Sequence, residues 1–127
     1  KFIDKMIKGE EIIVNGDGEQ TRDFTFVQNA VQANLRALSS SNQEAFGKVY
    51  NVACGQSYTL NQVLEDIKTN LVAKGVYNSA TKITYGPPRE GDVRNSLASV
   101  DRISHYLNYS NPIEFEEGMK ELCAVIS

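Results

Sequence analysis

Two arginines and one aspartate stand at turns of this sequence, in patterns that suit a ligand with both a phosphate and a sugar. Arg22 follows a glycine-rich stretch, and Arg89 and Asp92 stand three residues apart across a glycine. A guanidinium fork makes charge-assisted hydrogen bonds to a phosphate, each worth about 1.5–3 kcal/mol when partly shielded from water. A carboxylate accepts hydrogen bonds from sugar hydroxyls. Local sequence also leaves open that Arg22 only pairs with Asp23 or Glu19 at the surface.

Several other chemistries lack the residues they need. The 127 residues include 13 Lys and Arg against 16 Asp and Glu, and a net charge of -3 disfavours binding along a nucleic-acid backbone. One histidine and two cysteines supply neither a zinc site nor a disulfide framework. No tyrosine is followed by lysine four positions later, and no Walker loop, Gly-x-Ser-x-Gly or His-Glu-x-x-His motif is present. We therefore predict no catalytic residue, no cofactor-binding residue and no metal ligand in this chain.

The apolar stretches are too short for a transmembrane helix, and residues 1–8 lack the long apolar middle of a signal peptide. We therefore expect a cytoplasmic protein with no membrane partner. The sequence has no initiator Met and opens inside a helical pattern. We interpret the chain as a piece of a longer protein.

Short strands are expected to position the three candidate residues. The predicted strands are residues 12–14, 21–27, 48–53 and 82–85. Asn-Gly and Asp-Gly dipeptides separate the first two, which predicts a hairpin with Asn15 and Arg22 flanking its turn. Pro87 and Pro88 stiffen the chain just before Arg89, so that side chain should be presented at a defined angle.

Apolar residues at helical spacing predict helices between these strands. The predicted helices are one that Gly9 ends, one over 27–38, one from the capping box of Thr59 and Gln62 to Gly75, one over 100–107 and one begun at Pro112. The second carries Val27, Val31, Leu35 and Leu38 along one face. About four to five helices alternating with short strands predict a small mixed α/β domain.

Three segments in series resemble the C-terminal half of extended short-chain dehydrogenase/reductases that act on nucleotide sugars. They are Gly16-Asp17-Gly18-Glu19-Gln20-Thr21-Arg22-Asp23-Phe24-Thr25-Phe26-Val27, then Tyr50-Asn51-Val52-Ala53 with the capped helix after it, and then Pro87-Pro88-Arg89-Glu90-Gly91-Asp92-Val93-Arg94-Asn95-Ser96. The likeness covers nearly the entire chain and is nearest to NAD-dependent nucleotide-sugar 4-epimerases of the UDP-N-acetylglucosamine type. It implies the C-terminal lobe of a Rossmann-type enzyme whose Rossmann half, with the NAD loop and the Tyr-x-x-x-Lys pair, is absent from this sequence.

The resemblance also implies roles for individual residues. Arg22 would hold the diphosphate, and Arg89 and Asp92 would hold the diphosphate and the ribose hydroxyls. Asn15 falls where relatives pack a residue, often an aromatic one, against the uracil, so an amide departs from the family's pattern. For Arg94 two readings stay open, a substrate contact or an ion pair that holds the loop of Arg89.

For residues 1–127 the resemblance therefore implies one nucleotide-sugar-binding lobe. It would anchor UDP while an NAD-dependent epimerase oxidises C4 of the sugar and reduces it again. The alternatives are the same lobe in a 4,6-dehydratase, decarboxylase or reductase, or a non-catalytic nucleotide-sugar-binding module. NAD would be bound by the missing N-terminal half and not by this fragment. The expected partner is a UDP-sugar, with a homodimeric parent and a fragment that is monomeric and inactive alone.

Overall fold

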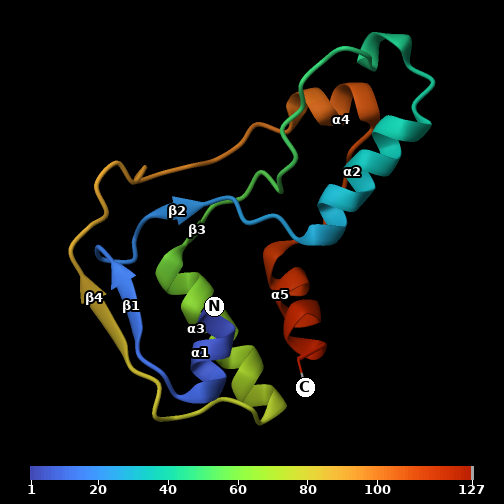
Figure 1. The fold of residues 1–127 in the computed structure, drawn as a ribbon. Coiled ribbons are helices and arrows are strands. Elements are labelled where there is room, and N and C mark those ends of the chain that lie inside the picture. The colour runs from blue at the N-terminus through green and yellow to red at the C-terminus, as the bar shows by residue number, and fades with distance from the viewer. Residues whose placement is uncertain (127) are drawn as a thin grey trace.

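The computed structural model describes residues 1–126, and its four strands pair in two separate sheets. The strands are β1 (Ile12–Asn15), β2 (Thr21–Arg22), β3 (Tyr58–Thr59) and β4 (Ile83–Gly86). β1 lies parallel to β4, with Asn15 opposite Gly86. β2 lies antiparallel to β3 (Figure 1). Each sheet therefore joins segments that are far apart in the sequence.

The predicted hairpin between residues 12–14 and 21–27 is wrong. The chain does turn there, because Gly16 and Gly18 have positive φ angles of 83° and 77°. Beyond the turn, however, β2 pairs with β3 and β1 pairs with β4. The turn residues allow the bend, and packing between distant segments decides which strands pair.

The structure contains five α-helices and one 3-10 helix. They are α1 (Phe2–Lys8), α2 (Val27–Ser39), the 3-10 helix η1 (Gln43–Ala45), α3 (Leu60–Lys74), α4 (Asp101–Leu107) and α5 (Phe115–Ala124). The predicted capping box of Thr59 and Gln62 is confirmed, and Gly75 ends α3 in the left-handed conformation. The expected small mixed α/β fold is confirmed as well. Within the described part of the chain, no helix combines the length and the apolar character needed to cross a membrane.

The last helix begins later than predicted, at Phe115 instead of Pro112. The side chain of Asn29 explains the delay. Its Oδ1 accepts from the N–H of Ile113 at 2.8 Å, and its Nδ2 donates to the carbonyl of the same residue at 2.8 Å. Because these backbone groups are bonded to α2, Ile113 stays outside the helix.

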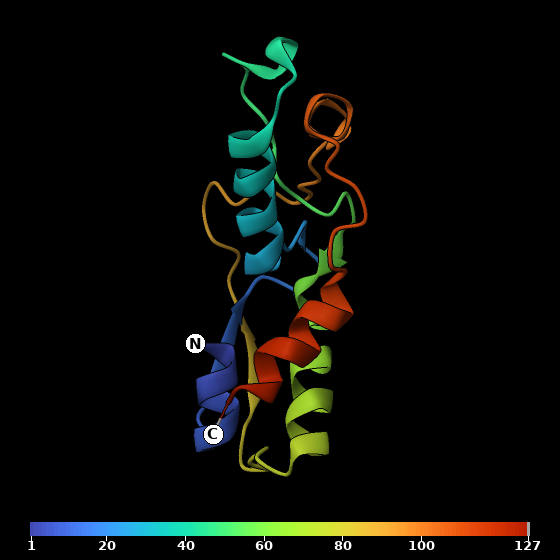
Figure 2. The ribbon, with the colours of Figure 1, turned by 90° about the vertical axis from the view of Figure 1, so that its right-hand side faces the viewer.

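The molecule is elongated, with two separate hydrophobic cores (Figure 2). The larger core lies among α1, α3, α5 and β1 and consists of Met6, Ile12, Val14, Val63, Leu64, Ile67, Leu71, Phe115 and Cys123. The smaller core lies between α2, α4 and η1 and consists of Ala33, Ala45, Ile103, Leu107 and Tyr109. The paired strands β1 and β4 and the start of α3 belong to the region of the larger core. This region carries the site described below.

The apolar face of α2 points outward. Its side chains have exposed fractions of 66% at Val27, 50% at Val31, 51% at Leu35 and 84% at Leu38. An apolar stripe of this kind ordinarily faces a core. In this structure α2 instead buries Asn29 and Ala33.

The strand predicted over residues 48–53 is not formed. Within residues 1–126 this segment pairs with no other strand, and Val49 is 79% exposed. A side chain instead of a strand bonds the backbone of this segment: Arg102 donates to the carbonyl of Val49 at 3.2 Å. Alternation of apolar and polar residues favours an extended backbone, whereas a strand also needs a neighbouring strand with free N–H and C=O groups.

Candidate functional site

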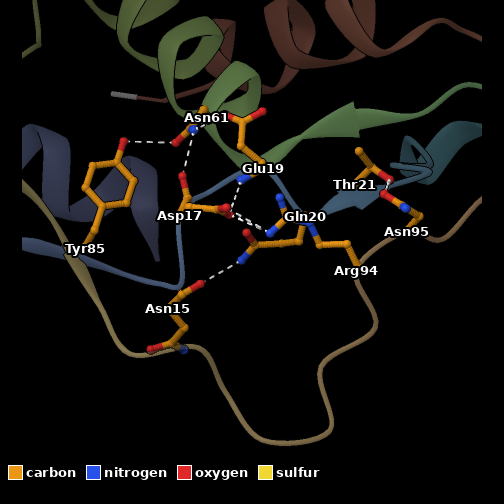
Figure 3. Close-up of polar contacts among 9 residues, drawn as sticks. All are labelled: Asn15, Asp17, Glu19, Gln20, Thr21, Asn61, Tyr85, Arg94 and Asn95. Carbon is orange, nitrogen blue, oxygen red and sulfur yellow. Dashed lines mark hydrogen bonds and ion pairs between the residues drawn. The ribbon is translucent and has the colours of Figure 1, made fainter.

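A tight glycine turn, residues 16–20, follows β1 and forms one side of the site. Gly18 has a φ of 77°, and a Cβ at this position would collide with the side-chain amide of Asn61, so a substitution would be strained and would displace Asn61. Asn61, in the first turn of α3, donates through Nδ2 to the carbonyl of Asp17 at 3.0 Å and to Glu19 Oε1 at 2.6 Å. The Tyr85 hydroxyl donates to Asn61 Oδ1 at 3.0 Å (Figure 3). The turn is therefore held against both α3 and β4.

A second loop, residues 87–93, faces the glycine turn; we call it the proline loop. It leaves β4 at Gly86, whose carbonyl accepts from the N–H of Gly16 at 3.1 Å. It returns beside β2, where the N–H of Thr21 donates to Arg94 O at 2.9 Å and the N–H of Ser96 donates to Thr21 O at 3.2 Å. Both ends of the proline loop are thus bonded to backbone next to the glycine turn.

Arg22 and Asp92 meet between β2 and the proline loop. Nη2 of Arg22 donates to Oδ1 of Asp92 at 2.5 Å, and Nη1 donates to the carbonyl of Thr21 at 2.6 Å. The two side chains are 32% and 34% exposed. Two of the predicted site residues, 70 positions apart, are therefore in direct contact.

The structure pairs Arg22 with Asp92 and not with Asp23 or Glu19. The carboxylate of Asp23 accepts instead from the N–H groups of Cys54 at 3.0 Å and Gly55 at 2.9 Å. The next residue, Phe24, packs on the larger core. The three consecutive side chains of Arg-Asp-Phe thus go to three places, and only the first reaches the site.

A cavity of about 360 Å³ lies along β1, between residues 1–5 and the proline loop. Its wall includes Asn15, Gln20, Leu60, Arg89 and Asp92. Three of the four residues predicted from sequence therefore line one cavity. The fourth, Arg22, is not on its wall but contacts Asp92, which is.

Sequence reasoning missed Gln20 and Leu60 on this wall, and also Lys1 and Lys5. Gln20 belongs to the Gln-x-Arg-Asp-Phe stretch, and this was the only signal for it; its Nε2 donates to the carbonyl of Asn15 at 2.9 Å. Leu60 is the first residue of α3. No local pattern places it at a cavity.

The charges around the cavity favour an anionic ligand. Lys1, Lys5 and Arg89 line the wall together with one carboxylate, that of Asp92. The first N–H groups of α3, by contrast, already have partners, because those of Leu60 and Asn61 donate to the carbonyls of residues 20 and 18. A phosphate would therefore be bound by side chains and not by the free N–H groups of this helix.

Beside the cavity, Arg94 makes an ion pair with Asp17. Nη1 of Arg94 lies 2.9 Å from both carboxylate oxygens of Asp17. The N–H of Glu19 and, next, the guanidinium of Arg94 hold the pKa of Asp17 below its ordinary value. Of the two roles left open for Arg94, the structure shows the ion pair.

The glycine turn does not fit the pyrophosphate of a dinucleotide. The glycine turn leads into β2, whereas a dinucleotide loop leads into a helix whose N-terminus receives the pyrophosphate. Among residues 1–126, no group of three His, Cys, Asp or Glu side chains is placed to hold a metal ion. The cationic side chains at the cavity can bind an anion, and the carboxylate of Asp92 can accept from hydroxyl groups.

Residues 1–122 match the family described as GDP-mannose 4,6 dehydratase, and the chain belongs to this family. Fold and sequence place it with the C-terminal domain of NAD-dependent short-chain dehydrogenase/reductases that act as nucleotide-sugar epimerases and dehydratases.

Individual proteins of known or proposed activity are similar to this chain. A putative UDP-glucose 4-epimerase of Methanocaldococcus jannaschii is 32% identical over 95% of this chain and 36% of its own. The UDP-glucose 4-epimerase of Thermotoga maritima, solved with UDP-glucose, has a TM-score of 0.80 at 32% identity, over 97% of this chain and 37% of that one. The UDP-N-acetylglucosamine 4-epimerase of Methanobrevibacter ruminantium, solved with UDP-N-acetylmuramic acid, has the same score and identity, over 98% and 37%.

The present chain thus spans little more than a third of the length of these relatives. Other epimerases of this fold have been solved with NAD bound.

Proposed function

We propose that this chain is the substrate-binding lobe of an enzyme that modifies nucleotide sugars, first of all an NAD-dependent 4-epimerase acting on a UDP-sugar. One observation carries the proposal. Arg89, Asp92 and Asn15 come from two distant segments and line one cavity, with Arg22 in contact with Asp92. A cation can donate to a diphosphate, a carboxylate can accept from ribose hydroxyls and an amide can bond a base, so this set suits a nucleoside diphosphate.

Each residue has a distinct role in this proposal. Arg89 donates to the diphosphate, and Arg22 adds a second positive charge next to Asp92. Oδ1 of Asp92 already accepts from Arg22, so its other oxygen accepts from a ribose hydroxyl. The backbone carbonyl of Asn15 is bonded to Gln20, which leaves its side-chain amide to contact the base.

Anchoring the nucleotide serves a reaction in which the sugar must turn. Binding energy from the non-reacting end of a substrate retains a reactive intermediate while another part of the molecule moves. The cavity of this chain would supply that energy. Proton and hydride transfer are assigned to other parts of such an enzyme, and so is NAD, because the glycine turn here leads into a strand and not into a helix.

The same lobe would serve a 4,6-dehydratase, a decarboxylase, a reductase or a non-catalytic nucleotide-sugar-binding module. Relatives of this chain include a UDP-N-acetyl-alpha-D-glucosaminuronate decarboxylase, 25% identical over 95% of this chain and 37% of its own. A glycine-rich nucleotide loop and a Tyr-x-x-x-Lys pair encoded upstream would favour an enzyme. Their absence from the upstream reading frame would favour the module.

An amide-shift titration of the labelled chain tests the site directly. UDP and UDP-N-acetylglucosamine are expected to shift the amides near Arg22, Arg89 and Asp92, with millimolar affinity corresponding to about 4 kcal/mol. Inorganic phosphate alone should shift fewer of them. Arg89→Ala should weaken UDP binding about tenfold, since one charge-assisted hydrogen bond is lost.

Arg36→Ala is the matched control, because this arginine lies on α2 and outside the cavity. It should leave the UDP affinity unchanged. Shifts scattered over the surface, or an unchanged affinity in Arg89→Ala, would overturn the assignment.

A further inference from the structure

The proline loop is held at its ends and, in between, by the ion pair of Asp92 with Arg22. All of residues 87–93 are exposed. Within this stretch of the described chain, the one backbone hydrogen bond runs from the N–H of Asp92 to the carbonyl of Arg89 at 3.2 Å. The positions of Arg89 and Asp92 therefore depend on the anchors that flank the loop and, for Asp92, also on Arg22.

Arg94 is the anchor on the carboxyl side. Its carbonyl accepts from the N–H of Thr21, and its guanidinium pairs with Asp17 from a position 77 residues away in the sequence. Next to it, Asn95 and Thr21 join their side chains at 3.2 Å (Figure 3). The guanidinium of Arg94 is not part of the cavity wall.

Asp17 is itself held in place before it meets Arg94. Its carbonyl accepts from Asn61, and its Oδ1 accepts from the N–H of Glu19 at 3.0 Å. Asn61 in turn accepts from the hydroxyl of Tyr85 on β4. The glycine turn thus offers a carboxylate at a defined place, and the proline loop attaches to it.

We propose that Asp17 and Arg94 are a positioning pair for nucleoside diphosphate binding. Their ion pair sets the distance between the proline loop and the glycine turn, and so places Arg89 and Asp92 without touching the ligand. This inference rests on the proposed function, since it concerns the same cavity. In the rival role, Arg94 leaves Asp17 and binds the phosphate directly. The two roles predict opposite changes in UDP affinity when Asp17 loses its charge.

Asp17→Asn decides between the two roles in a UDP titration of the labelled chain. If the pair positions the loop, the substitution weakens UDP binding about two- to fivefold, the range expected for losing an exposed ion pair. If Arg94 binds phosphate directly, the same substitution frees its guanidinium and removes a nearby negative charge. UDP binding would then tighten, and the proposal would be overturned.

Arg94→Gln and a charge exchange complete the test. Arg94→Gln should weaken binding as much as Asp17→Asn, and the double substitution no further, because both remove one interaction. The exchange Asp17→Arg with Arg94→Asp should recover part of the lost affinity, which a merely structural loss would not allow. The control is Glu65→Gln, which breaks an exposed ion pair with Lys68 on α3 and should leave affinity unchanged.

Amide hydrogen exchange of the ligand-free chain separates this proposal from the proposed function. The amide of Asp92 and the amides of Thr21 and Ser96, which bond the carboxyl end of the proline loop, should exchange faster in Asp17→Asn and Arg94→Gln than in the wild type or Glu65→Gln, with an unchanged melting temperature. Equal exchange would overturn the positioning pair even if UDP binds. Failure of the wild type to bind UDP would overturn the proposed function, while faster exchange in the variants would still support the anchor.

Discussion

The two cores of this molecule differ in what their helices contribute: in the smaller one α4 buries Ile103 and Leu107, whereas α2 contributes only the small side chain of Ala33. The larger core encloses large apolar residues, among them Met6, Leu64 and Leu71, all at most 2% exposed. In the smaller core, Ala33 and Ala45 fill space against α4, while larger apolar side chains of α2 face outward. The comparison teaches that an apolar stripe on a helix marks a surface available for burial, and that the neighbouring elements decide which face is covered.

The candidate site rests on the region of the larger core. β1, β4 and the start of α3 carry Asn15, the ends of the proline loop and Asn61. The region of the smaller core reaches this framework through side chains, with Asn29 bonded to Ile113 and Asp23 bonded to the backbone of residues 54 and 55. Four substitutions probe this difference.

Leu71→Ala should have the largest effect. This side chain is fully buried between α3 and its neighbours, so its loss removes apolar contacts and leaves a cavity, at a cost of about 2–5 kcal/mol in unfolding free energy. Leu38→Ala, at an 84% exposed position of α2, should change stability by less than about 0.5 kcal/mol. Urea denaturation measures both. Equal losses would show that the outer face of α2 is buried in solution.

Asn29→Ala tests the link between the two regions. Asn29 is 3% exposed, and its amide satisfies both backbone groups of Ile113. Removing it leaves buried polar groups without partners, which should cost about 1–3 kcal/mol. Asn34→Ala is the control, because that exposed side chain bonds only to the carbonyl of Ala30 in its own helix. A urea midpoint shared by both variants would contradict a bridging role for Asn29.

Thr59→Ala tests the start of α3, which supports the glycine turn. The threonine hydroxyl accepts from the N–H of Gln62, and its removal should cost about 1 kcal/mol in unfolding free energy. Thr59→Ser keeps this acceptor and should retain most of the stability. Thermal unfolding of both variants gives the comparison, and a serine variant as unstable as the alanine variant would argue against capping.

Asp66 should give the smallest effect, a dependence of stability on pH. Burial, and then repulsion from Glu116 on α5, raise the pKa of Asp66 above its ordinary value of 3.8. The folded state therefore binds this proton more tightly than the unfolded state. Its contribution to stability is complete below pH 3.8 and is lost as the pH rises through the folded pKa.

Asp66→Asn should abolish this contribution, so the difference in unfolding free energy between wild type and variant should shift in favour of the variant as the pH rises. Urea denaturation from pH 3.5 to 7 measures it. Parallel curves for the two proteins would contradict a raised pKa. Asp17 beside the site has a lowered pKa, so its contribution runs in the opposite direction and is lost as the pH falls.

Local chemistry made the helices and the candidate residues readable from the sequence. Thr59, Gln62 and Gly75 define the ends of α3 through bonds made within a few residues, so their positions were predicted correctly. Arg89, Asp92 and Asn15 were selected by residue type and family resemblance, and the structure brings them to one cavity. Their roles in binding stay predictions.

By itself, the sequence determined where the chain bends, where the capped helix α3 starts and stops, and which side chains can hold an anion, because these depend on backbone preferences and side-chain chemistry over a few residues. Only the tertiary structure decided that β1 pairs with β4, that α2 turns its apolar face outward, and that Arg22 meets Asp92. Both pairings join segments tens of residues apart, and the orientation of α2 depends on which distant elements pack against it. Such contacts are selected by the packing of the whole molecule, and no local pattern contains that information.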